Sequence, residues 1–148
     1  MGYNLKRSYL LVREEVLRVL APYDLRPTSF SALVIIVDNP NLSQSGLAKA
    51  LEIKRSGVVL IADELEKAEL ISRNNVPGDR RSYALRATEK GQQLCDRVVR
   101  QVRDAEANLL SVLSEEETRL LFQLYEKIIG DADRELLNRT PPRGQEYD

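Results

Sequence analysis

The sequence contains no histidine, no tryptophan and only one cysteine among its 148 residues. Without histidine the chain cannot form a Ser–His–Asp or Cys–His catalytic group, a histidine-ligated metal site or an imidazole proton shuttle. The single cysteine, Cys95, excludes a disulfide within the chain. The many carboxylates follow helical charge patterns that are typical of a solvated face. We therefore predict that the protein is not an enzyme and uses no metal and no cofactor.

Long apolar runs and an excess of either charge are also missing. No stretch approaches the roughly 18 apolar residues that a membrane span needs, and the start carries no secretory signal pattern. We expect no membrane partner and a cytoplasmic location. A net charge of −1 excludes a globally basic, histone-like binder, but it leaves room for local basic clusters that bind DNA.

Both ends of the chain show helical periodicity. Apolar residues recur every three or four positions over residues 3–20 and 88–112, which is the spacing of one helix face. Ser114 and Glu117 then form a capping-box pattern. This pattern predicts a further helix that ends near residue 137.

The middle of the chain has the pattern of a helix-turn-helix followed by a hairpin. The expected helices are residues 27–37, 43–51 and 54–70, and the expected strands are 71–75 and 82–85. Ser43 is a suitable N-cap for the second of these helices, and Pro77-Gly78 signals a turn between the strands. Short helices joined by a tight turn, with a hairpin directly after them, make a winged helix.

The fold class predicted is therefore mainly α with a small β-hairpin wing. Residues 27–87 suffice for the winged helix, so the helices in 1–24 and 88–137 need another surface to cover their apolar stripes. A symmetric homodimer is the common solution, and the alternative is a monomer that folds its own ends together. We treat residues 1–148 as a single domain and expect residues 138–148 to form a loose tail.

Several motifs give the sequence a family resemblance. They are Leu42-Ser43-Gln44-Ser45-Gly46-Leu47-Ala48, Asp63-Glu64-Leu65-Glu66, and Asp79-Arg80-Arg81 followed by Leu85 and Thr88-Glu89-Lys90-Gly91. Over about residues 25–95 the chain resembles the MarR-type (multiple antibiotic resistance regulator) winged-helix transcriptional regulators. The resemblance implies a homodimer with recognition helices in successive major grooves and wings in minor grooves. It also implies that many members are repressors, released by small, often aromatic, ligands.

Local charge supports binding of double-stranded DNA. Residues 71–86 hold four arginines and one aspartate, a local charge of +3. Lys54 and Arg55 add positive charge where a helix begins, an end that already favours phosphate. The expected DNA-binding residues are Ser43, Gln44, Lys54, Arg55, Ser56, Arg73, Asp79, Arg80 and Arg81.

The expected reading helix departs from the polar pattern that is usual in the family. Gly57, Val59 and Leu60 stand where polar residues are usual along its exposed face. Val59 and Leu60 suit contacts with thymine methyl groups. Gly57 either permits close approach to DNA or carries no role.

The effector-binding residues expected from the resemblance are Tyr9, Arg13, Tyr23 and Phe30. Arg13 suits a bidentate contact with an anionic, aromatic ligand, and the alternative for Tyr9 and Phe30 is a place in the core. Cys95, on the long helix after the wing, is expected to be a packed, inert thiol. Its alternative is a redox role through a bridge between two protomers.

Together these observations predict a ligand-responsive transcriptional regulator, a repressor that binds a pseudo-palindromic operator as a homodimer. The alternative is a winged-helix module that binds proteins and recognises no operator. Salt-dependent DNA binding distinguishes the two, because phosphate contacts release counterions.

Overall fold

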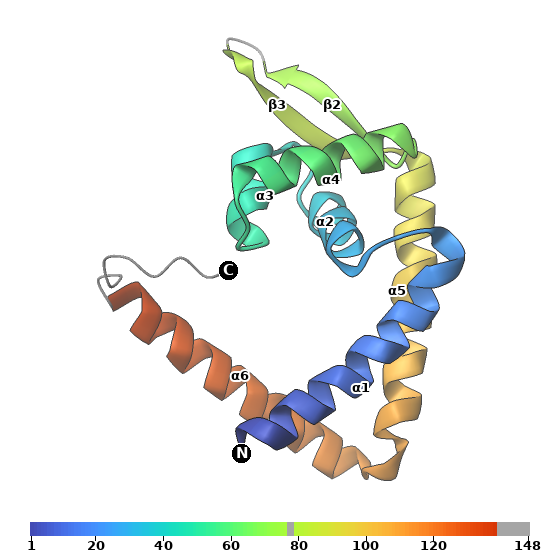
Figure 1. The fold of residues 1–148 in the computed structure, drawn as a ribbon, viewed down its shortest axis with the longest axis vertical. Coiled ribbons are helices and arrows are strands. Elements are labelled where there is room, and N and C mark those ends of the chain that lie inside the picture. Colours follow the sequence, from blue (N-terminus) through green and yellow to red (C-terminus); the bar gives the residue numbers. More distant parts are fainter. Residues whose placement is uncertain (77–78, 139–148) are drawn as a thin grey trace. The chain divides into compact units, whose positions relative to one another are not determined.

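The computed structural model describes the backbone of residues 1–76 and 79–138, and the side chains of residues 1–74 and 83–130. The chain divides into two compact units, Met1–Asn108 and Leu109–Asp148. The fold predicted from the sequence, mainly helical with a small antiparallel sheet, is confirmed (Figure 1).

The first unit contains the winged helix and two long helices. Its helices are α1 (Gly2–Leu20), α2 (Pro27–Asp38), α3 (Gln44–Ala50), α4 (Arg55–Lys67) and α5 (Glu89–Leu109), with a short 3-10 helix η1 (Ala21–Tyr23). Its strands are β1 (Leu42–Ser43), β2 (Ile71–Val76) and β3 (Asp79–Ala87). The second unit contains the 3-10 helix η2 (Leu110–Val112) and α6 (Glu115–Asn138).

One hydrophobic core joins the elements of the first unit. The fully buried side chains Leu20, Leu33, Ile36, Leu47, Leu65, Leu85 and Val98 come from α1, α2, α3, α4, β3 and α5. α2 supplies the most apolar segment, as its run of consecutive aliphatic residues predicts. This shared core fixes α3, α4 and the sheet as one rigid support for whatever their outer surfaces bind.

The sheet has one strand more than the sequence predicted. β1 pairs antiparallel with β3 through Leu42↔Leu85 and Ser43↔Ala84, so the strand order is β1-β3-β2. A strand of two residues is too short for an alternating pattern, which is why sequence reasoning missed it. β1 ties the start of α3 to the base of the hairpin.

α4 ends earlier than predicted. It stops at Lys67 rather than at Leu70, because Glu69 adopts a left-handed conformation with φ 60°. Ala68, directly after the last helical residue, is exposed. Lys90 Nζ donates to the Ala68 carbonyl at 2.9 Å and lies 3.1 Å from Glu69 Oε2, so a side chain from α5 satisfies the end of α4.

α5 begins with a side-chain cap at the Thr88-Glu89-Lys90-Gly91 motif, since Thr88 Oγ1 accepts a hydrogen bond from Gly91 N at 3.0 Å. Its end differs from the prediction. The helix stops at Leu109, and Val112 lies in η2 with 86% of its side chain exposed. The apolar stripe therefore ends before Val112.

In the second unit the capping box is confirmed. Ser114 N donates to Glu117 Oε2 at 2.8 Å, and Glu117 N donates to Ser114 Oγ at 3.2 Å. The Ser114 backbone N–H and, to a smaller extent, the Ser114 hydroxyl lower the pKa of the Glu117 carboxyl, because hydrogen bonds to the carboxylate favour its charged form. Beyond Asn138, the predicted loose tail lies outside the described residues.

The long helices expose apolar side chains. On α1 they are Tyr3, Leu5, Tyr9, Leu10 and Leu11, and on α6 they are Leu120, Phe122, Leu124, Ile128 and Ile129. In the described part of the chain, no helix has both the length and the apolar content to cross a membrane. The predicted stripe on α1 is exposed at Leu5 and Tyr9 and half-buried from Val12 onward, whereas the predicted stripe on α5 is buried or half-buried up to Leu109.

Candidate nucleic-acid interface

The helix-turn-helix is built by local hydrogen bonds. Ser43, in an extended conformation, caps α3 by accepting from Gly46 N at 3.0 Å, as predicted. After α3 the chain reverses at Glu52, whose φ of 54° is left-handed, and Ile53 N donates to the Ala48 carbonyl at 3.1 Å. This tight turn sets the start of α4 at the surface, while α3 and α4 stay packed together.

The start of α4 gathers three of the predicted DNA-binding residues. Lys54 is the N-cap, in an extended conformation, and Arg55 and Ser56 form the first turn. All three are exposed, because the buried face of the helix lies elsewhere, along Val58 and Leu65. Two cations, a hydroxyl and the free N–H groups of a helix start together suit contacts with phosphate and base edges.

Two further predicted residues lie on α3 and its cap. The Ser43 side chain is exposed, but its oxygen already accepts the capping hydrogen bond from Gly46 N. Gln44 is half-buried at the first position of α3. Their expected role in binding DNA stays a prediction.

Arg73 has partners that sequence reasoning missed. Its guanidinium forms an ion pair with Asp63 Oδ1, and its Nε lies 3.5 Å from Glu66 Oε2. Only 19% of the Arg73 side chain is exposed. The arginine therefore joins β2 to α4 and neutralises acids of the reading helix. The motif Asp63-Glu64-Leu65-Glu66 could have indicated this pairing, since Asp63 and Glu66 are one helical turn apart and can contact the same cation.

The wing is the β2–β3 hairpin, whose strands are longer than predicted. β2 pairs antiparallel with β3 from Ile71↔Ala87 outward, with an irregularity between Asn75 and Val76. The backbone of β3 includes the predicted Asp79, Arg80 and Arg81, but their side chains lie outside the described residues. Arg86, nearer the base of the hairpin, is exposed.

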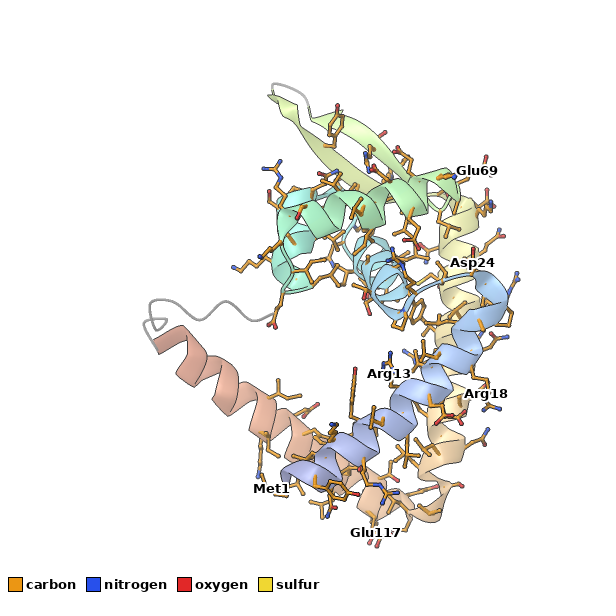
Figure 2. The ribbon with its side chains drawn as sticks, viewed as in Figure 1. Met1, Arg13, Arg18, Asp24, Glu69 and Glu117 are labelled. Carbon is orange, nitrogen blue, oxygen red and sulfur yellow. The ribbon has the colours of Figure 1, made fainter. Side chains whose placement is uncertain are left out.

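The four predicted effector residues lie in different surroundings within the described part of the chain. The Tyr23 hydroxyl donates to Gln101 Oε1 at 2.9 Å, which links the turn after α1 to α5. Phe30 is half-buried against the core, whereas Tyr9 is 62% exposed and is not a core residue. Arg13 is exposed on α1, and Figure 2 labels it on that helix, before Asp24 and the α1–α2 connection.

Tyr23 does line a cavity of about 510 Å³ in the first unit. The described lining comes from the α1–α2 connection and the end of α4: Tyr23, Asp24, Leu25, Arg26, Glu64, Leu65, Lys67, Ala68 and Leu70. Arg26 forms an ion pair with Glu64, which also accepts from the buried Ser29 Oγ at 3.0 Å. The Arg26 guanidinium and the Tyr23 ring thus lie at the edge of one cavity.

Cys95 is buried against the core, as predicted for a packed thiol. Burial, with smaller contributions from Asp96 and Asp38, raises the pKa of its thiol to about 11. The reactive form of a cysteine is the thiolate, so this thiol is unreactive at neutral pH. Over the described ranges, there is no group of three or more histidine, cysteine or acidic side chains that suits a metal ion.

Comparison with known proteins identifies relatives of this arrangement. The MarR family pattern matches residues 25–83. A putative transcriptional regulatory protein for the hcr operon of Thauera aromatica is 31% identical over 129 residues, covering 86% of this chain and 78% of the relative.

Two solved structures extend the comparison. The transcriptional repressor CouR bound to a 23-mer DNA duplex is similar with a TM-score of 0.80 and 35% identity, covering 87% of this chain and 92% of that one. CouR from Rhodococcus jostii RHA1 bound to p-coumaroyl-CoA is similar with a TM-score of 0.73 and 26% identity, covering 86% of this chain and 89% of that one. Both likenesses span the winged helix and the helices that flank it.

Proposed function

Because this chain belongs to the MarR family of transcriptional regulators, we propose that it is a repressor that binds a pseudo-palindromic operator as a homodimer and is released by a small ligand. The observation that carries the proposal is the exposed group Lys54, Arg55 and Ser56 at the start of α4. A helix-turn-helix reads the major groove with the N-terminal residues of its second helix, and this is where the group lies.

The wing, together with the start of α3, completes the proposed interface. Arg80 enters the minor groove, Asp79 pairs with Arg81 and stiffens the tip, and Ser43 and Gln44 contact the DNA beside α4. Minor-groove arginines respond to groove width and potential more than to base identity. The protein acts in the cytoplasm, where this interface meets chromosomal DNA.

The homodimer is supported by the apolar side chains that a single chain leaves exposed on α1 and α6. Leu5 and Leu10 on α1, and Leu124 and Ile128 on α6, are each more than 40% exposed. A second copy is the common means of covering such stripes. Two reading helices on one face of DNA then require half-site centres about 10 base pairs apart.

Footprinting on a selected operator tests this geometry. We expect two protected half-sites related by a pseudo-twofold axis and a 2:1 ratio of protein to duplex.

Ile128→Glu should weaken both the dimer and operator binding, whereas Lys127→Glu, its exposed neighbour on α6, serves as the matched control. One asymmetric half-site with a bound monomer would overturn the proposed assembly. Absence of any salt-dependent DNA binding would favour the protein-interaction alternative.

The effector proposed is a small aromatic or other anion that binds where α1, α2 and α5 meet. Tyr23 supports this location, since its hydroxyl joins the α1–α2 connection to Gln101 of α5. The cavity beside Tyr23 lies toward the end of α4, and Arg26 there can pair with an anion that displaces Glu64. The bound p-coumaroyl-CoA of the Rhodococcus relative is an aromatic acyl thioester, which agrees with that class. Tyr9, Arg13 and Phe30 are the further residues proposed to contact the ligand.

Release of labelled operator by candidate ligands tests the switch. Aromatic acids and their coenzyme A thioesters are the compounds to titrate. A 100-fold rise in the dissociation constant needs a preference of only about 2.7 kcal/mol for the DNA-incompetent form. Arg13→Ala should reduce the response, while Arg7→Ala, which changes an exposed arginine near the start of the same helix, should keep it. If no compound shifts binding, the protein is a constitutive binder and the effector proposal fails.

A further inference from the structure

The outward face of α4 changes character after its first turn. Val58, Ile61 and Leu65 are buried on one side of the helix, at 0%, 6% and 0% exposure. Steps of 100° per residue place Ser56 and Leu60 on the opposite side. Leu60 is 67% exposed, and Val59 beside it is 37% exposed. An apolar pair therefore stands directly after the polar start of the helix.

The acids that follow on α4 already have partners. Asp63 is paired with Arg73. Glu64 is paired with Arg26 and accepts from Ser29. Their negative charge also disfavours a direct approach to phosphates. The helix thus offers few hydrogen-bonding groups for bases beyond Ser56.

Gly57 has no side chain, so only backbone atoms form the helix surface beside Leu60. A Cβ at this position would meet only Ile53 Cδ1, at 3.5 Å, which is ordinary contact, so packing within the chain does not require glycine there. The bare backbone at Gly57 leaves Leu60 as the most prominent side chain of this turn.

We infer that Leu60 reads the 5-methyl group of a thymine in the major groove, with Val59 as its flank. The inference rests on the proposed function and names the base feature that α4 recognises. The thymine methyl is the one apolar group that base pairs display in that groove. Lys54 and Arg55 lie one to two turns earlier, where they suit the phosphates that border the same groove.

The size of the apolar pair favours DNA over a protein partner. One leucine and one valine fall far short of the surface that a stable protein–protein contact buries, roughly 800 Å² per partner. Next to phosphate-binding cations, the same pair is large enough for a methyl contact. Burial of one methyl group in each half-site corresponds to about four-fold in affinity, or about fifteen-fold for both.

Deoxyuridine substitution tests the contact, because it removes the thymine methyl and keeps the base pair. Duplexes are first selected from a random library with the full-length protein. Each thymine is then replaced in turn, and binding is measured for the wild type, Leu60→Ala, Val59→Ala and Val112→Ala. Val112 is an apolar residue of η2, 86% exposed, and serves as the matched control.

For the wild type and Val112→Ala, we expect one thymine per half-site whose replacement weakens binding about four-fold. Leu60→Ala should bind the thymine and deoxyuridine duplexes equally. A selected operator with no methyl dependence, or with a dependence that Leu60→Ala retains, would overturn this inference alone. A dependence lost only in Val59→Ala would assign the contact to Val59 and equally overturn it. Failure to select any duplex would overturn the proposed function as well.

Discussion

A Cβ atom placed on Gly91 would lie 1.9 Å from the carbonyl oxygen of Leu70. The first turn of α5 therefore rests directly on the backbone that leads from α4 into β2. Thr88 holds the same junction from the other side, since its hydroxyl donates to the Glu69 carbonyl at 2.7 Å and its N–H donates to the Leu70 carbonyl at 3.0 Å. Only glycine permits this approach.

Gly91→Ala should therefore lower the free energy of unfolding by about 3 kcal/mol, since the clash involves backbone that cannot rotate away. Thermal and urea unfolding of the purified protein measure the change. Gly57→Ala is the matched control, because its Cβ meets only a side-chain atom at 3.5 Å. That control should gain about 1 kcal/mol from better helix propensity. Equal stability of the two variants would contradict the close packing.

Arg73 provides a second prediction, which separates a positioning role from direct contact with phosphate. Arg73→Ala should weaken operator binding, because it leaves Asp63 and Glu66 unpaired on the reading helix. Adding Asp63→Asn and Glu66→Gln should restore most of the lost affinity if Arg73 acts by neutralising them.

Fluorescence anisotropy with the selected operator measures the affinity of the wild type, Arg73→Ala, the triple variant and Arg73→Lys at one salt concentration. Arg73→Lys should keep part of the affinity, since the charge remains but the planar guanidinium that reaches both Asp63 and Glu66 is lost. If the triple variant binds as weakly as Arg73→Ala, the guanidinium contacts DNA itself, as the sequence alone predicted.

Cys95 gives a prediction about pH. The pKa of its thiol rises from 9.0 to about 11 on folding, so the native state holds this proton more tightly than the unfolded chain. Above about pH 9 the unfolded chain loses the proton first, and the free energy of unfolding should fall as pH rises toward 11. Cys95→Ser should remove this part of the pH dependence.

Thiol labelling provides an independent check on Cys95. The native protein should react with iodoacetamide slowly at pH 8, and the urea-unfolded chain should react at the rate of an ordinary cysteine. A peroxide-induced dimer on a non-reducing gel, linked to loss of operator binding, would instead support a bridge between protomers.

The helices and the hairpin were predictable because their signals are local. Apolar spacing identified α1 and α5, and the cap residues Ser43 and Ser114 marked helix starts that the structure confirms. The exposed group at the start of α4 was likewise visible, because its residues are adjacent in the sequence.

What the sequence did not predict depends on contacts between distant residues. Charge counting treated Arg73 as a free cation, although Asp63 lies ten positions earlier and pairs with it. The end of α4 was placed too late because Glu69, a residue that rarely turns left-handed, occupies the position. The Thr-Glu-Lys-Gly motif was noticed as a resemblance, and its physical reason is the contact of Gly91 with Leu70.

The last prediction concerns the wing. Arg80→Ala should weaken binding by a similar factor for many operator sequences, because a minor-groove arginine contributes charge more than base identity. Loss of one phosphate-neutralising charge per protomer should reduce the slope of log affinity against log salt by roughly 2 for a dimer. Arg86→Ala is the matched control, since Arg86 pairs in register with Ser72 near the base of the hairpin and should change the slope less. Arg80→Lys should retain most of the slope, because the charge remains. Unchanged affinity of Arg80→Ala at two salt concentrations would exclude Arg80 from the interface and leave α4 as the main source of affinity.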